Sequence, residues 1–231
     1  MMIDISNLSL EYNHTKTMAL KNIDFYLTKG EMAFLVGESG AGKTSLINII
    51  MGNIKPTSGR ATVNGISLTN RGINKVQKVS LRRQIGPIFQ DFKLFKGRSV
   101  LENVLIGLRV LGPITEEDKH HVIQLLNQVG LQDMINHKID HLSFGERQRV
   151  AITRAVARKP EIILADEPTG NLDQETAFNI LKLLASFKSN NTTILITTHA
   201  THLLKYFQGR VITLKSGQVS SDDYLEKEES R

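Results

Sequence analysis

The chain has 231 residues, 40% of them hydrophobic and 23% charged, which predicts a globular protein of one α/β domain, with or without an inserted lobe. Its net charge of +6 comes without a dense run of Lys and Arg, so a slightly basic protein with no nucleic-acid partner is expected. The absence of cysteine excludes disulfide bonds, and no apolar run approaches the roughly 18 residues of a membrane span.

The N-terminal part of the chain predicts short strands on either side of a glycine-rich loop, and no signal peptide is expected there. Alternating apolar residues at 3–10 predict an edge strand. A wholly apolar strand at 34–36 precedes the glycine-rich loop, and a helix over 46–50 follows it. Residues 61–68 predict a hairpin that turns at Asn64-Gly65.

The middle of the chain predicts helices. Ser99 with Glu102, and Thr115 with Asp118, have the spacing of reciprocal helix caps. These helices are expected to form an inserted α-helical subdomain with bounds of about 92–145.

The C-terminal half returns to an alternating pattern, with helices predicted at 146–158 and 174–188 and strands at 162–165 and 193–197. Apolar strands separated by helices are typical of a parallel sheet covered on both faces. Residues 1–221 are therefore interpreted as one domain. The mostly charged residues 222–231 predict a frayed tail.

The strongest chemical signal is the loop Gly37-Glu38-Ser39-Gly40-Ala41-Gly42-Lys43-Thr44, which fits the Walker A pattern between a strand and a helix. Its glycines let successive backbone N–H groups surround phosphate oxygens, and the following helix adds partial positive charge. Lys43 is expected to reach the β- and γ-phosphates and Thr44 to ligate Mg²⁺. Ser45, the next residue, is counted with the phosphate-binding set.

The second signal is the pair Asp166 and Glu167, which ends an apolar strand where doubly wound sheets bind ligands. Asp166 is expected to hold Mg²⁺, and Glu167 to polarise the attacking water. Strands often end in acids for no chemical reason, but the Walker A loop favours the catalytic interpretation. The guanine-reading motif has one near match, at 74–77, and it lacks the required Asp, so ATP rather than GTP is expected.

A family resemblance begins at Leu142-Ser143-Phe144-Gly145-Glu146, which resembles the signature motif of ATP-binding cassette (ABC) ATPases, normally Leu-Ser-Gly-Gly-Gln/Glu. The order of Walker A, Gln90, signature, Walker B, Asn171-Leu172-Asp173 and His199 is similar to that family across nearly the whole chain. The resemblance implies the α/β fold of P-loop NTPases, with a mainly parallel core sheet, an N-terminal antiparallel β subdomain and the helical subdomain.

The resemblance also implies roles for single residues. Ser143, Gly145 and Glu146 would cap ATP held by a second copy of the chain, so an ATP-sandwich homodimer is expected. Ser143 and Glu146 also have the spacing of a capping box at a helix start.

Three further residues carry over from the family by position. Gln90 would join Thr44 and Asp166 at Mg²⁺ and lie beside the docking groove of a membrane subunit. His199 would contact the γ-phosphate and act with Lys43 and Glu167 in catalysis. Tyr12 would stack on adenine.

Four segments resemble the cell-division type of these ATPases, namely 30–35, 81–86, 88–91 and 165–173. This resemblance implies a peripheral ATPase on the cytoplasmic face of the inner membrane, bound to an integral permease that controls cell-wall hydrolases. The last segment is shared with lipoprotein-release and export ATPases, which stay an alternative.

A third hypothesis is a soluble cassette ATPase that binds nucleic acid or the ribosome, or a module that hardly hydrolyses ATP. Phe144, standing in place of the first signature glycine, keeps weak hydrolysis or weak dimer closure open.

Overall fold

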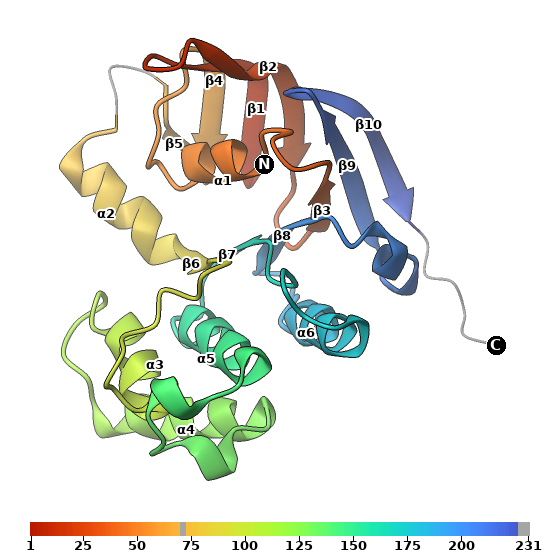
Figure 1. The fold of residues 1–231 in the computed structure, drawn as a ribbon. Helices are drawn as coiled ribbons and strands as arrows, with labels where there is room; N and C mark the ends of the chain where they lie inside the picture. The colour runs from red at the N-terminus through yellow and green to blue at the C-terminus, as the bar shows by residue number, and fades with distance from the viewer. Residues whose placement is uncertain (70–72, 226–231) are drawn as a thin grey trace.

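The computed structural model describes residues 1–69 and 73–225, which form two sheets and a helical lobe (Figure 1). The strands are β1 Ile3–Tyr12, β2 Thr17–Leu27, β3 Met32–Val36, β4 Ser58–Val63, β5 Ile66–Ser67, β6 Ile85–Ile88, β7 Ile162–Asp166, β8 Thr193–Thr198, β9 Gly209–Lys215 and β10 Gln218–Leu225. The α-helices are α1 Lys43–Ile50, α2 Lys75–Gln84, α3 Val100–Leu108, α4 Glu116–Gln128, α5 Phe144–Val156 and α6 Gln174–Ser186. Short 3₁₀ helices are η1 Gln132–Met134, η2 Ile139–His141 and η3 Thr201–Tyr206.

The central sheet has the order β10-β9-β3-β8-β7-β6 within the described residues. Neighbours from β9 to β6 are parallel, and β10 pairs antiparallel with β9. Strands β3 and β8 are buried throughout because apolar clusters cover both faces of the sheet. Helix α1 and the antiparallel sheet lie on one face, and α5 and α6 lie on the other. The parallel α/β core predicted from the alternating pattern is confirmed.

The antiparallel sheet, in the order β2-β1-β4-β5, corrects one prediction. Strand β1 is not an edge strand, because it pairs with β2 on one side and with β4 on the other. Alternating burial shows only that one face of a strand is covered, and it carries no information about the number of neighbouring strands. The predicted hairpin at Asn64-Gly65 is confirmed between β4 and β5.

The helical lobe occupies the lower part of Figure 1 and is built from α3, α4 and the outer face of α5. Its core includes Val104, Val122 and Val150, each fully buried. The capping boxes predicted at Ser99 and Thr115 are both present. The helices expected in this region are therefore confirmed, while the subdomain bounds stay a prediction.

The C-terminal strand corrects a second prediction. Residues 222–225 are not frayed, because they continue β10 beside β9. Asp222 accepts hydrogen bonds from Arg210 at 2.5 and 2.6 Å, and this partner raises the pKa of the buried Arg210 guanidinium. A charged side chain can thus belong to an edge strand when a buried cation pairs with it. The rest of the predicted tail, 226–231, lies outside the described residues.

Within the described part of the chain, none of the helices combines the length and the apolar character that crossing a bilayer requires.

Candidate functional site

The Walker A loop joins the end of β3 to the start of α1, in the context that the sequence predicted. Gly37 has φ 152°, and a Cβ there would stand 2.3 Å from the Leu214 carbonyl oxygen. Gly42 has φ 107°, and a Cβ there would stand 2.7 Å from the Ala19 carbonyl oxygen. Both positions therefore require glycine, because the loop turns tightly against neighbouring backbone.

Lys43 reaches back across this loop from the first turn of α1. Its ammonium group donates to the carbonyl oxygens of Gly37 at 2.7 Å and Glu38 at 3.1 Å. It also forms an ion pair with Glu167 Oε1 at 3.1 Å, and only 5% of the Lys43 side chain is exposed. A phosphate that binds Lys43 competes with Glu167 for the same cation.

The ends of β7 and β8 hold the two acidic residues. Thr197 on β8 donates from its hydroxyl to Asp166 Oδ1 at 2.8 Å and accepts from the backbone N–H of Glu167 at 2.8 Å. The Thr44 hydroxyl lies 3.3 Å from Asp166 Oδ1. Thr197 was not predicted from the sequence, although a threonine directly after the apolar run 194–196 was a usable signal. Its hydroxyl fixes the backbone and the side chain of the acidic pair together.

Glu167 lies between two cationic or protonatable groups. One carboxylate oxygen pairs with Lys43, and the other contacts His199 Nδ1. Glu167 has φ 50°, a strained conformation for a residue with a side chain, and its side chain is 14% exposed. Residues from the loop after β3, the end of β7 and the end of β8 thus meet at one carboxylate.

These groups open into a cavity of about 760 Å³. Its lining comes from the loop after β3, from β2 and from the strand ends, and consists of Tyr12, Thr17, Met18, Ala19, Glu38, Ser39, Gly40, Gly42, Lys43, Thr44, Ser45, Gln90, Glu167 and His199. The Tyr12 hydroxyl lies 3.0 Å from Ser45 Oγ. Most predicted site residues therefore share one cavity. The three lining residues on β2 were not predicted from the sequence.

The predicted signature residues lie elsewhere, at the start of α5. The Ser143 backbone and hydroxyl both donate to Glu146 Oε2 at 2.8 Å, and the Glu146 N–H donates to Ser143 Oγ at 3.3 Å. Hydrogen bonds from the Ser143 backbone and then its hydroxyl lower the pKa of Glu146. We call residues 143–146 the signature tip. The capping box predicted for this tip is confirmed, and its residues do not line the cavity at Lys43.

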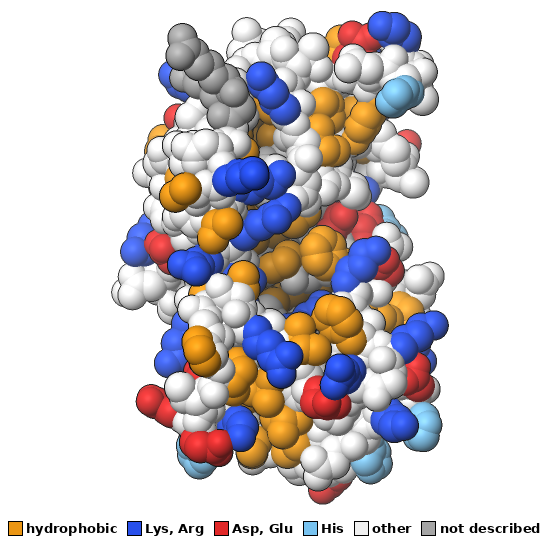
Figure 2. Space-filling view, turned by 90° about the vertical axis from the view of Figure 1, so that its left-hand side faces the viewer, with side chains coloured by type: hydrophobic (Ala, Val, Ile, Leu, Met, Phe, Trp, Pro, Cys, Tyr) orange, Lys and Arg blue, Asp and Glu red, His pale blue; other side chains and the backbone are white. Residues whose placement is uncertain are grey.

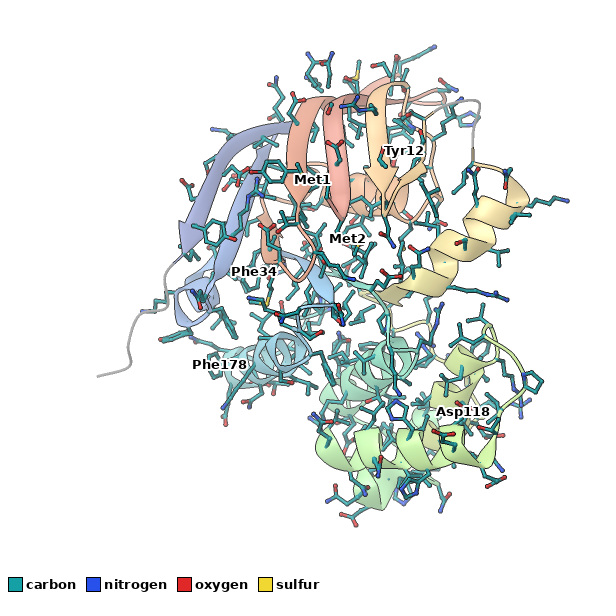
Figure 3. The ribbon with its side chains drawn as sticks, turned by 180° about the vertical axis from the view of Figure 1, so that it is seen from behind. Met1, Met2, Tyr12, Phe34, Asp118 and Phe178 are labelled. Atoms are coloured by element: carbon teal, nitrogen blue, oxygen red, sulfur yellow. The ribbon has the colours of Figure 1, made fainter. Side chains whose placement is uncertain are left out.

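Figure 3 labels Tyr12 at the antiparallel sheet and Asp118 on helix α4 of the helical lobe, at opposite ends of the view.

Residues 20–170 match the family described as ABC transporter. The chain belongs to the ABC ATPase family. It is 38% identical over 223 residues to the cell division ATP-binding protein FtsE of Mycobacterium tuberculosis, covering 96% of each chain. Among solved structures it is similar to the dimeric cassette MJ0796 bound to ADP and Pi, with a TM-score of 0.85, 33% identity, and 97% and 99% of the two chains covered.

A second solved structure, cbiO1 from Clostridium perfringens, is part of the ABC transporter complex cbiONQ. It superposes with a TM-score of 0.84 at 30% identity and covers 96% of this chain and 87% of its own. The chain is thus an ABC ATPase that binds and hydrolyses ATP.

One residue of this ABC ATPase departs from the family's signature motif. Phe144 stands where the first glycine is usual, and its ring centroid lies 4.5 Å from that of Phe92, at an interplanar angle of 69°. The bulky side chain is therefore engaged within its own chain.

Proposed function

We propose that this ABC ATPase is the ATP-hydrolysing subunit of a membrane complex of the cell-division type. The catalytic part of the proposal rests on Glu167, which bridges Lys43 and His199 at the edge of a cavity that the signature tip does not reach. The cell-division part rests on the 38% identity to the FtsE protein named above. In the proposed mechanism, the ATP phosphates bind Lys43 and replace Glu167 as its ion-pair partner. The freed carboxylate then orients the attacking water, and His199 contacts the γ-phosphate. The loop amides and Lys43 stabilise charge that develops on the transferred phosphoryl group.

We assign Mg²⁺ to oxygen donors at the same edge. The Thr44 hydroxyl and the Asp166 carboxylate lie 3.3 Å apart, and oxygen ligands are what Mg²⁺ prefers. Gln90 lines the cavity and is the third proposed ligand. The ion would neutralise charge on the phosphate oxygens, while Thr197 keeps Asp166 in position.

The signature tip supports a second copy as partner. Ser143, Gly145 and Glu146 are surface groups at a helix start, a place where backbone N–H groups favour an anion. The tip lies outside the cavity of its own chain, so it is suited to cover the cavity of another. The similar cassette MJ0796 is dimeric with ADP and Pi bound. Two chains related by a two-fold axis would then enclose two ATP molecules.

A groove between the core and the helical lobe supports a membrane subunit as the second partner. A cavity of about 320 Å³ is lined by Met51, Asn53, Arg82, Ile85, Pro87, Phe89, Val110 and Arg158, and a neighbouring one of about 250 Å³ adds Lys93, Phe95, Ile106, Gly107, Arg154 and Ala155. Figure 2 shows this face, with apolar side chains in the hollow and Lys and Arg around it. Val110 and Phe95 are 44% and 51% exposed there. An apolar helix that carries an acidic residue fits this groove.

The relative's name, cell division ATP-binding protein, supports a role in cell division. The resemblance of segments 30–35, 81–86, 88–91 and 165–173 to the cell-division type implies an FtsX-like permease as that subunit. It also implies an ATPase on the cytoplasmic face of the inner membrane, with control of cell-wall hydrolases as the output. The alternative is the ATPase of a lipoprotein-release or export complex, favoured only by the shared segment 165–173.

The first experiment replaces Glu167 by Gln. We expect turnover to fall about 100- to 10,000-fold, because a general base is lost, while ATP binding and the ATP-bound dimer persist. Glu117→Gln, an exposed change on α4, is the matched control and should keep full turnover. Wild-type turnover in the Glu167 variant would refute the assigned role.

The second experiment reverses one charge in the groove. Arg82→Glu should weaken co-purification with an FtsX-like four-span membrane protein, while ATP hydrolysis by the isolated chain stays unchanged. Lys182→Glu, an exposed charge reversal on α6, should change neither co-purification nor ATP hydrolysis. Co-purification with a lipoprotein-release permease in place of the FtsX-like protein would favour the alternative.

A further inference from the structure

The turn that follows Gln90 has an unusual backbone. Phe92 and Lys93 have φ of 60° and 49°, so two successive residues with side chains adopt the left-handed region. Such conformations cost free energy and persist only where the surrounding structure holds them. Gln90, two residues earlier, lines the nucleotide cavity. The position of Gln90 therefore depends on what holds this turn.

Arg154 on helix α5 stabilises the turn by hydrogen bonds. Its guanidinium donates to the Phe92 carbonyl oxygen and to the Lys93 carbonyl oxygen, both at 2.6 Å. Arg154 is half-buried, and this burial lowers the pKa of its guanidinium. Helix α3 packs on its stem, because a Cβ at Gly107 would lie 2.8 Å from Arg154 Cγ. Arg154 thus links the turn to α5, the helix that begins at the signature tip.

Phe144 links the same turn to the signature tip through a direct side-chain contact. The Phe92 side chain is 8% exposed, and the Phe144 ring meets it edge to face. Phe144 is the residue after Ser143, which caps α5. A glycine at position 144 has no side chain that reaches Phe92. The substitution in the signature motif therefore adds a direct contact between the turn after Gln90 and the tip.

We propose that Phe144 is a positioning residue that couples occupancy of a chain's own nucleotide cavity to the placement of its signature tip. A shift of Gln90 on ATP binding moves Phe92, and Phe92 carries Phe144 and the Ser143 cap with it. This inference rests on the proposed ATP-bound dimer, because the tip acts on the partner's nucleotide. It differs from the weak dimer closure considered in the sequence analysis, in which a bulky residue at position 144 only obstructs closure.

The test uses the Glu167→Gln chain as parent and measures the ATP concentration that gives half-maximal dimer, alongside ATP affinity in dilute monomer. Phe144→Ala should raise the dimerisation midpoint about 2- to 10-fold, the size of an aromatic-pair contribution, with monomer affinity unchanged. Phe144→Leu should recover part of the loss. Leu111→Ala, at a residue just after α3 that is 45% exposed, is the control and should leave the midpoint unchanged.

A double-mutant cycle separates coupling from general damage. Phe92→Leu should raise the midpoint as Phe144→Ala does, and the double variant should be no worse than the more affected single variant. If the fold-change in the midpoint of the double variant equals the product of the two single fold-changes, the inference is overturned. A Phe144→Gly variant that dimerises more readily than the parent would also overturn it. A parent that does not dimerise with ATP would overturn the proposed dimer and this inference together. A dimerising parent that is indifferent to Phe144→Ala would overturn the inference alone.

Discussion

The cavity edge and the signature tip hold their polar groups by opposite means. At the cavity edge, hydrogen bonds join residues far apart in the chain, with Thr44 and Asp166 separated by 122 positions and Thr197 and Asp166 by 31. At the tip, Ser143 and Glu146 are three positions apart within one helical turn. The cavity edge therefore forms only when the sheet has assembled, whereas the tip is specified by its own helix start.

This difference separates two kinds of damage. Changes in the sheet should remove the nucleotide site, because β7 leads into Glu167 and β8 leads into His199, and both residues line the cavity. Changes at the tip should leave a single chain able to bind ATP and should act on steps that need a second chain.

The largest expected effect tests the dependence of the cavity edge on the sheet. Leu164 lies in β7, two positions before Asp166, and is 1% exposed. Leu164→Ala should lower the free energy of unfolding by about 2–5 kcal/mol, because it leaves a cavity in the core. Urea denaturation measures this loss. Leu111→Ala, at a residue 45% exposed, should change the same free energy by less than about 0.5 kcal/mol. Equal losses for both would contradict the comparison.

The next effect concerns the cation at the cavity edge. Lys43→Ala removes charged hydrogen bonds to the phosphates, which are worth about 1.5–3 kcal/mol, so the affinity for ATP should fall roughly 10- to 150-fold. Titration with a fluorescent ATP analogue measures the dissociation constant. Lys182→Ala, on the exposed side of α6, should retain the parent affinity. An unchanged affinity in the Lys43 variant would break the assignment of the cavity to ATP.

The same division decides what the sequence could predict. The Walker A loop, the capping boxes and the Asn64-Gly65 hairpin are local patterns, and the structure confirms each of them. Thr197 and the cavity residues of β2 were missed, because their roles depend on which strands become neighbours. The edge position predicted for β1 and the frayed state predicted for 222–225 were wrong for the same reason. Neither the order of strands in a sheet nor a buried partner such as Arg210 can be deduced from the residues adjacent in sequence.

A smaller effect tests the tip. Ser143→Ala removes the N-cap of α5 and should lower the free energy of unfolding by about 0.5–2 kcal/mol. ATP affinity in dilute monomer should stay at the parent value, while turnover at high protein concentration falls. Thermal unfolding and analogue titration measure the two quantities. A loss of monomer affinity as large as that of the Lys43 variant would show that the tip and the cavity edge are not separate.

The smallest expected effect is a pH dependence of the capping box at the signature tip, which a capping box without an ionisable group in the same chain should lack. The pKa of Glu146 is lowered below its ordinary value of 4.5 by the Ser143 hydrogen bonds, so the carboxylate stabilises the folded tip above that value. This contribution is lost as the pH falls through the lower folded pKa. Helix α2 carries a capping box between Asn74 and Gln77 that has no ionisable group. Hydrogen exchange at the Glu146 amide, corrected for intrinsic rates, should lose protection below about pH 4.5 relative to the Gln77 amide. Glu146→Gln should remove this pH dependence, and an equal loss at both caps would instead indicate global acid unfolding.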